Sequence, residues 1–307
     1  MTTASVSQSC FPIMSFLHVP GKMSQPLWLM MGTAFLVNVS RRTGTAACPF
    51  GSADASDGVD SSAHKRRRFL LTAKHTFVPW QFTDPQRLKV PEEYRRTRFV
   101  IGRLYIPDSE GKAVASLSVD LKLVAMHPTA DVAVLVAKVP TSVASDAAGT
   151  ASRSAVSERF DAHAELERRA NAVGGGLTLA PEDPQKGSVC SIAGYRGTGL
   201  LGKLDTFDPD LLDRLSETER GQLLSSLRCV EGQQEAAVAR VKIFHSKGMC
   251  RAEEGSCFHG MSGAPVLTDE KTCGGVLYGK HPDDANSVGY VPVRSFDGFV
   301  WDSVIGK

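Results

Sequence analysis

The 307 residues are enough for one large domain or two ordinary ones, and either could bury a core without disulfide bonds. The composition, with 42% hydrophobic and 22% charged residues, is that of a soluble globular protein, and no apolar run is long enough to span a bilayer. Because 35 Lys and Arg stand against 33 Asp and Glu, the net charge is only +2, and no direct nucleic-acid partner is predicted.

The seven cysteines are an odd number without a Cys-x-x-Cys pair, which argues against a disulfide framework and against a structural zinc site. We therefore expect mostly reduced thiols, no metal and an intracellular location. The N-terminal residues are rich in Ser and Thr and contain no acidic residue before Asp54, as in organellar leaders, yet no arginine precedes Arg41. Mitochondrial and cytoplasmic locations both stay open.

The first half of the chain contains short apolar runs separated by turn-rich segments. The run at 119–125 alternates apolar and polar residues, as a half-buried strand does, and the others are rich in β-branched or aromatic residues. No helical pattern separates them, so residues 13–140 are predicted to form a first β-barrel. The runs lie at 27–39, 67–73, 98–106, 119–125 and 131–139.

Residues 141–176 shift to Ala, Ser and charged residues and are predicted to be a linker or insertion with one amphipathic helix, ended by three glycines. A second β-rich half follows at 177–307, interrupted at 205–236 by leucines whose spacing predicts a helical insertion, and it ends in a short helix. Two β halves favour either a pair of barrels or a sandwich with a second module. The strand-like runs of this half lie at 188–195, 239–244, 264–268, 274–279 and 288–293.

Three residues could form a site for nucleophilic catalysis. Ser262 lies near two glycines and could be a turn serine or a nucleophile, because a serine nucleophile needs a base and a group that orients the base. His75 follows a strand-like run, and Asp131 begins another, where a partly buried carboxylate needs a partner such as an imidazole. The order along the chain is therefore His, Asp, Ser.

Other residues near these three have more ordinary interpretations. His127 is the nearest rival as a base, but it precedes a proline in a predicted turn. Cys257 lacks an obvious dedicated base, which favours an inert thiol. Lys74 is the neighbour of His75, and we expect it to be solvated, since strand alternation turns it away.

In this order, the sequence resembles the trypsin-like serine peptidases, which have the chymotrypsin fold. The similar segments are LLTAKH at the histidine, DVAVL at the aspartate, GMSGAP at the serine and GGVLYG after it, with GTAFLV ahead of the first. A single Gly-x-Ser-Gly motif is weak evidence, but several landmarks in the family's order are strong evidence. The resemblance implies an all-β fold of two six-stranded antiparallel β-barrels with helical insertions.

The resemblance also implies a role for each residue. Ser262 would attack a carbonyl carbon, His75 would take and return the proton, and Asp131 would hold the imidazole. The backbone N–H groups of Gly260 and Ser262 would form the oxyanion hole, and neither a metal nor an organic cofactor would be needed. The substrate pocket carries no acidic group, which favours a small or apolar side chain at the cleavage site. Its implied residues are Gly255, Ser256, Cys257, Phe258, Leu277, Tyr278 and Gly279.

Two departures from the family's pattern favour its intracellular, HtrA-type branches over the digestive enzymes. Thr76 stands where many secreted relatives have a cysteine, and Met261 replaces the acidic residue that activated zymogens use. The resemblance thus implies an endopeptidase acting on polypeptide substrates, or a related acyl transfer such as ester hydrolysis. The alternative is a catalytically idle domain that serves as a structural subunit or assembly factor of a large, for instance mitochondrial, complex. Residues 141–176 and 205–236 are the candidate protein-docking surfaces.

Overall fold

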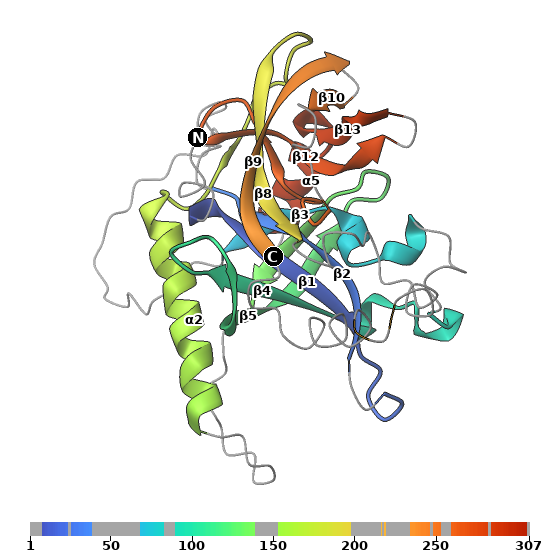
Figure 1. The fold of residues 1–307 in the computed structure, drawn as a ribbon, viewed down its shortest axis with the longest axis vertical. Coiled ribbons are helices and arrows are strands. Elements are labelled where there is room, and N and C mark those ends of the chain that lie inside the picture. The colour runs from blue at the N-terminus through green and yellow to red at the C-terminus, as the bar shows by residue number, and fades with distance from the viewer. Residues whose placement is uncertain are drawn as a thin grey trace, which may run out of the picture.

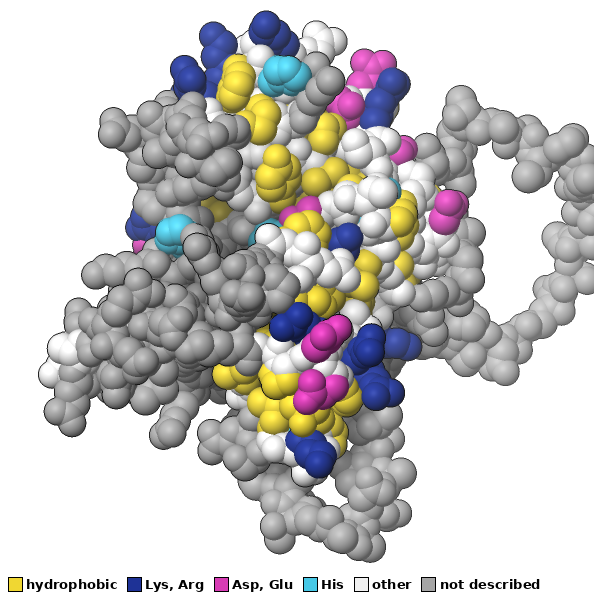
Figure 2. Space-filling view, turned by 90° about the vertical axis from the view of Figure 1, so that its right-hand side faces the viewer, with side chains coloured by type: hydrophobic (Ala, Val, Ile, Leu, Met, Phe, Trp, Pro, Cys, Tyr) yellow, Lys and Arg dark blue, Asp and Glu magenta, His cyan; other side chains and the backbone are white. Residues whose placement is uncertain are grey.

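The computed structural model describes residues 8–23, 26–38, 68–82, 90–138, 153–197, 216, 218, 234–245, 248–252, 259–281 and 284–305. Two β-rich halves are visible in Figure 1, the first coloured blue to green and the second yellow to red. In Figure 2, acidic and basic side chains are interspersed over the lower part of the face shown, in keeping with the small net charge. Within the described ranges, no helix is both long and apolar enough to cross a membrane.

The first barrel closes in the strand order β1-β2-β3-β6-β5-β4, and all its pairings are antiparallel. Five of the strands coincide with predicted apolar runs, because such runs bury one or both faces of a strand. The exception is β1, which lies in the Ser-rich and Thr-rich N-terminal region and closes the ring by pairing with both β2 and β4. The strands are β1 (Cys10–Leu17), β2 (Leu27–Leu36), β3 (Phe69–Thr72), β4 (Val100–Pro107), β5 (Ala113–Met126) and β6 (Ala133–Ala137).

The second barrel has the strand order β11-β8-β9-β10-β13-β12 and is closed by the pairing of β11 with β12. A short strand, β7, adds to β12 in parallel. The predicted fold class of two six-stranded antiparallel barrels is therefore confirmed, and the alternative of a sandwich is wrong. The strands are β7 (Thr178–Leu179), β8 (Val189–Gly197), β9 (Gln234–His245), β10 (Met249–Ala252), β11 (Pro265–Leu267), β12 (Thr272–His281) and β13 (Asp284–Pro292).

The predicted helical insertion at 205–236 is wrong at its C-terminal end. Residues 234–236 belong to β9, which pairs with β8 from Gln234 opposite Gly197 to Lys242 opposite Val189. The first part of this strand is rich in alanine, which does not favour a strand, so the conformation comes from the pairing. Apart from residues 216 and 218, the rest of the predicted insertion lies outside the described residues.

One hydrophobic cluster runs through both barrels. It contains Phe35 and Val134 from the first barrel and Tyr195 and Val276 from the second. Val300 of α5 (Asp297–Ile305) joins the same cluster, so the predicted short C-terminal helix is present and covers the end of this core. Because the shared cluster excludes water, separating the barrels would expose apolar surface from each of them.

Helix α2 (Arg153–Ala172) is the one predicted between the two halves, and it packs against the first barrel. Ala162, Leu166 and Ala170 lie four residues apart and are buried in the core cluster of that barrel. The helix ends at the predicted glycines, where the N–H of Gly175 donates to the carbonyl of Ala170 at 2.7 Å.

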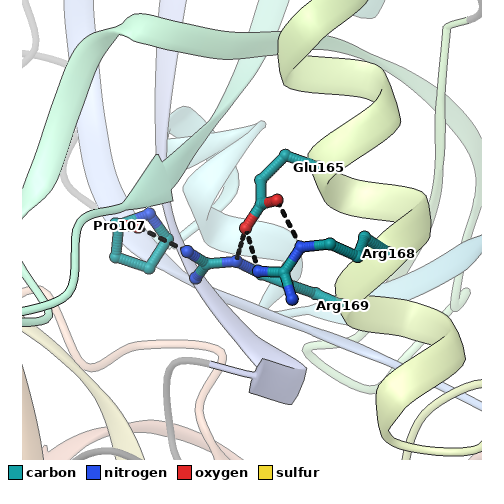
Figure 3. Close-up of polar contacts among 4 residues, drawn as sticks. All are labelled: Pro107, Glu165, Arg168 and Arg169. Atoms are coloured by element: carbon teal, nitrogen blue, oxygen red, sulfur yellow. Dashed lines mark hydrogen bonds and ion pairs between the residues drawn. The ribbon is translucent and has the colours of Figure 1, made fainter.

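A partly buried polar contact links this helix to the barrel (Figure 3). Arg169 Nε donates to Glu165 at 2.7 Å, and its terminal nitrogen donates to the carbonyl of Pro107 at the end of β4, also at 2.7 Å. Hydrogen bonds from Arg168 and then Arg169 lower the pKa of Glu165 to about 2. Their stabilising effect is therefore present above the ordinary carboxyl pKa and is lost as the pH falls toward 2.

Two neighbouring arginines allow a matched test of this contact. Arg169 is 13% exposed and bonds to the barrel, whereas Arg168 is 68% exposed and bonds only to Glu165 among the contacts drawn in Figure 3. Arg169→Met should lower the free energy of unfolding by about 1.5–3 kcal/mol, the value of a hydrogen bond to a charged group. Arg168→Met should lower it much less than Arg169→Met does, because solvent screens a pair whose arginine is this exposed. Urea denaturation at pH 7 measures both, and equal effects would contradict the role of the Pro107 contact.

Candidate active site

Strand pairing brings His75 and Asp131 together. In the register of β3 with β6, Thr72 lies opposite Ala133. His75 follows Thr72 in a single turn of 3-10 helix at Lys74–Thr76, and Asp131 lies two residues before Ala133. The end of one strand and the start of its antiparallel partner thus place the two side chains at one edge of the first barrel.

The His75 and Asp131 side chains form a close, buried pair. The distance from His75 Nδ1 to Asp131 Oδ2 is 2.6 Å, and the backbone N–H of His75 donates to Oδ1 at 2.8 Å. Each residue is only 9% exposed. Because the carboxylate holds Nδ1–H, the remaining ring nitrogen, Nε2, is the atom that can accept a proton.

Ser262 lies in a tight turn of the second barrel that packs against the first. Gly260 and Gly263 have φ values of +94° and +88°, which L side chains rarely adopt. A methyl group at position 263 would overlap Thr33 O and Thr72 Oγ1. The N–H of Gly263 also donates to Leu277 O at 2.8 Å, so the turn is held from both sides.

Thr33 of β2 is the main contact between that turn and the first barrel. Its N–H donates to the carbonyl of Ser262 at 2.8 Å, and its hydroxyl lies 3.3 Å from the carbonyl of Gly260. The same hydroxyl accepts the N–H of Tyr195 at 2.9 Å, while Thr33 O accepts the hydroxyl of Thr72 at 2.7 Å. Sequence reasoning missed this residue, and the GTAFLV segment that contains it was the only signal for it.

The turn leaves two backbone donors available. Within the described residues, neither the N–H of Gly260 nor the N–H of Ser262 donates a hydrogen bond. Since the carbonyls of both residues are bonded to Thr33, these donors are fixed in position by the first barrel. Two fixed, unpaired N–H groups, one of them that of the serine itself, can stabilise an oxyanion that develops next to the serine side chain.

The side chain of Ser262 is partly exposed, and no hydrogen bond joins it to His75 among the described residues. Contacts of the turn still place it beside the histidine segment. A methyl group at Gly263 would meet the backbone nitrogen of Ala73, and one at Gly32 would meet both Ser262 O and the Thr76 side chain. The hydrogen bond between nucleophile and base is often long in an unliganded site.

His127, the rival base, has a structural role instead. Its Nδ1 accepts the N–H of Ala130 at 2.8 Å, and its ring packs edge-on against Phe299 at 5.0 Å. Burial, followed by the charge of Lys74, lowers the pKa of His127, and a hydrogen bond to the backbone of Ser295 opposes this. The neutral ring therefore closes the turn that leads into Asp131.

Lys74 is not solvated, contrary to our expectation. It is 6% exposed, its Nζ donates to the carbonyl of His127 at 3.0 Å and lies 5.2 Å from the centre of the Phe82 ring. Alternation fails here because β3 ends at Thr72 and a helical turn follows. Lys74 thereby links the histidine segment to the turn before Asp131.

The predicted substrate pocket is described only in part. Gly255, Ser256, Cys257 and Phe258 lie outside the described residues. Of the others, Leu277 is buried, Gly279 is partly exposed and Tyr278 is 41% exposed. A cavity of about 460 Å³ is lined by Asp131 but by neither His75 nor Ser262, and its lining also includes Phe82, His127, Tyr278 and Tyr290.

Several solved structures are similar to this chain. The active form of the Rv3671c protease of M. tuberculosis matches with a TM-score of 0.44 and 14% identity over 96% of this chain and 80% of that one. The structure of GrC matches with a TM-score of 0.44 and 11% identity over 99% of this chain and 97% of that one. No protein-family model matches the sequence, and no curated protein matches it.

The chain's own strand order and site geometry define its fold. Two closed six-stranded antiparallel barrels carry the His and Asp on the first barrel and the Ser on the second. This is the chymotrypsin-like fold.

The Thr33 contact generates a prediction about stability. Thr33→Val keeps the shape of the side chain but leaves the buried N–H of Tyr195 without its acceptor, which should cost about 1–3 kcal/mol of unfolding free energy. Thr178→Val in β7 is the control, since no side-chain hydrogen bond of Thr178 is present among the described residues. Guanidinium denaturation should separate the two variants; an equal loss in both would mean that the hydroxyl of Thr33 has no special role.

The role of His127 can be tested with a pair of substitutions. Asn accepts backbone N–H groups two or three residues ahead, so His127→Asn should change the unfolding free energy by less than about 1 kcal/mol, whereas His127→Leu should lower it by about 1–3 kcal/mol. Thermal or urea denaturation at pH 7 checks both values. The opposite ranking would show that the ring does not act as an acceptor.

Proposed function

We propose that this protein is a trypsin-like serine endopeptidase that hydrolyses peptide bonds through an acyl-enzyme. The observation that carries the proposal is the His75–Asp131 pair, joined by two hydrogen bonds and facing a turn that holds Ser262 beside two unpaired N–H groups. Each element of nucleophilic catalysis is therefore assigned to a residue of the chain itself.

The proposed reaction uses these groups in two stages. Ser262 Oγ attacks the peptide carbonyl carbon as His75 Nε2 takes its proton, and the carbonyl oxygen becomes an oxyanion bound by the N–H groups of Gly260 and Ser262. When the C–N bond breaks, the imidazolium gives its proton to the leaving amine. Water then adds to the acyl-enzyme by the same route, and Ser262 regains its proton.

The protonated imidazole is stabilised by Asp131 throughout. The 2.6 Å contact fixes the ring, and the second hydrogen bond from the backbone of His75 fixes the carboxylate. Because both residues are largely buried, solvent does not compete for these bonds.

For specificity, we propose a small or apolar side chain at the cleavage site. Leu277, Tyr278 and Gly279 are uncharged, as are the four predicted pocket residues at 255–258. A peptide carrying such a side chain would not leave an unpaired charge buried in the pocket.

The first test is labelling of the purified chain with a fluorophosphonate, which reacts with an activated serine. Wild type should label, Ser262→Ala and His75→Ala should not, and Asp131→Asn should label at least a hundredfold more slowly because it loses the orienting carboxylate. His127→Asn is the matched control and should label at nearly the wild-type rate.

The competing function is that of an idle domain whose insertions dock other proteins. Absence of labelling in a wild-type protein shown to be folded by circular dichroism would overturn the peptidase proposal and favour this alternative. Affinity purification would then identify what binds to the insertions at 141–176 and 205–236. Labelling followed by hydrolysis of ester but not peptide substrates would instead indicate another acyl transfer.

A further inference from the structure

The outer face of the second barrel carries a basic and apolar groove of about 530 Å³, formed by residues of β8, β9 and β10. Lys242 lies at its centre. Lys242 of β9 pairs with Val189 of β8 and with Arg251 of β10. Arg240 and Phe244 lie two residues before and after Lys242 on β9. The side chains of these five residues face outward, since the intervening residues of β9 and β10 are buried.

The apolar members of the groove are unusually exposed for a sheet surface. Val189 is 54% exposed and Phe244 is 38% exposed, and only two other large hydrophobic side chains in the described part of the chain are comparably exposed. The guanidinium of Arg251 lies 5.6 Å from the centre of the Phe244 ring and holds it by a cation–π contact. The ring is therefore held in position without being buried.

The charged side chains among the described residues of the groove are all positive. Lys242 and Arg251 are directly opposite on adjacent strands, an arrangement that destabilises a sheet through repulsion. None of the described residues that line the groove carries a carboxylate, and within the same described ranges neither Arg240 nor Lys242 forms an ion pair. A bound anionic group would offset the charges of Arg240 and Lys242.

Figure 2 shows basic and hydrophobic side chains together in this part of the molecule. Lys and Arg side chains gather with hydrophobic ones at the upper end of the molecule, where Figure 1 places the start of β8 and the end of β9. The turn with Ser262 lies toward the other end of β8, because the N–H of Gly197 donates to His259 O at 2.7 Å. At about 3.3 Å per residue, the length of β8 puts roughly 25 Å between the groove and that turn.

We propose that this groove binds an extended acidic segment of another protein. Residues two apart on a strand face the same side about 6.6 Å apart, so Arg240, Lys242 and Phe244 form a row of two cations and one aromatic ring. An extended segment with the pattern acidic-x-acidic-x-apolar places its side chains at the same spacing. The apolar part of the row favours a peptide over a nucleic acid, which would offer charge without an aliphatic side chain.

The groove is a binding site apart from the triad, and its occupancy does not require peptidase activity. Because β9 is already paired with β8 and β10, the peptide binds through side chains and does not add a strand. A protein that carries such a segment would be held at a fixed distance from Ser262.

The test measures binding of a fluorescein-labelled peptide, Gly-Ser-Glu-Ser-Glu-Ser-Leu-Ser-Gly, to the full chain carrying Ser262→Ala, which prevents cleavage. Fluorescence anisotropy at low salt should show saturable binding. Lys242→Glu should raise the Kd at least tenfold, and it should not lower the thermal midpoint, since it turns the repulsion with Arg251 into attraction. The matched control, Lys122→Glu on β5, changes the net charge equally and should leave the Kd within twofold.

Two further probes separate the apolar contribution from the charge. Replacing the peptide's Leu by Ser should raise the Kd for the Ser262→Ala protein at least fivefold. In the protein that carries both Ser262→Ala and Phe244→Ser, the same change in the peptide should have little effect on the Kd. The proposal is overturned if the peptide does not bind, if Lys242→Glu and Lys122→Glu act alike, or if the Leu is dispensable. Tighter, Lys242-dependent binding of a twelve-nucleotide oligo-dT would also overturn it and indicate a polyanion site.

Discussion

The contact of Thr33 with the 260–263 turn is the constraint on which the rest of the site depends. One residue of the first barrel fixes both carbonyls of the turn and also bonds to β8, so the position of Ser262 relative to His75 is set by the packing of the two barrels. A glycine at 263 is required because the backbone of the turn approaches β2 and β3 too closely for a side chain. The bonds that dock the two barrels at this point are thus the same bonds that position Ser262.

In the turn before Asp131, a few contacts likewise hold two segments of the site together. Lys74 and His127 carry no assigned chemistry, yet they bond the segment that holds the histidine to the segment that holds the aspartate. Such contacts restrict the orientation of the His75–Asp131 pair.

Much of the fold could be predicted from the sequence because most strands are marked by apolar runs bounded by turns. The neighbours of His75 and Asp131 also form recognisable segments, and the structure brings these two residues together; the role of Ser262 stays a prediction. The prediction failed where tertiary context decides the outcome. β1 lies in a segment without strong alternation, the alanine-rich start of β9 is extended only because β8 pairs with it, and Lys74 is buried by a turn that follows its strand. Thr33 contacts a residue 227 positions away, which no local pattern encodes.

The division of the site between two barrels has a consequence for the newly made chain. His75 and Asp131 emerge from the ribosome long before Ser262, and the contact that fixes the turn cannot form until 227 residues have been added after Thr33. A chain made only as far as residue 140 contains both His75 and Asp131 but lacks Ser262. All the groups of the candidate site are therefore present only after the 260–263 turn has been made, and they come together only when the second barrel docks on the first.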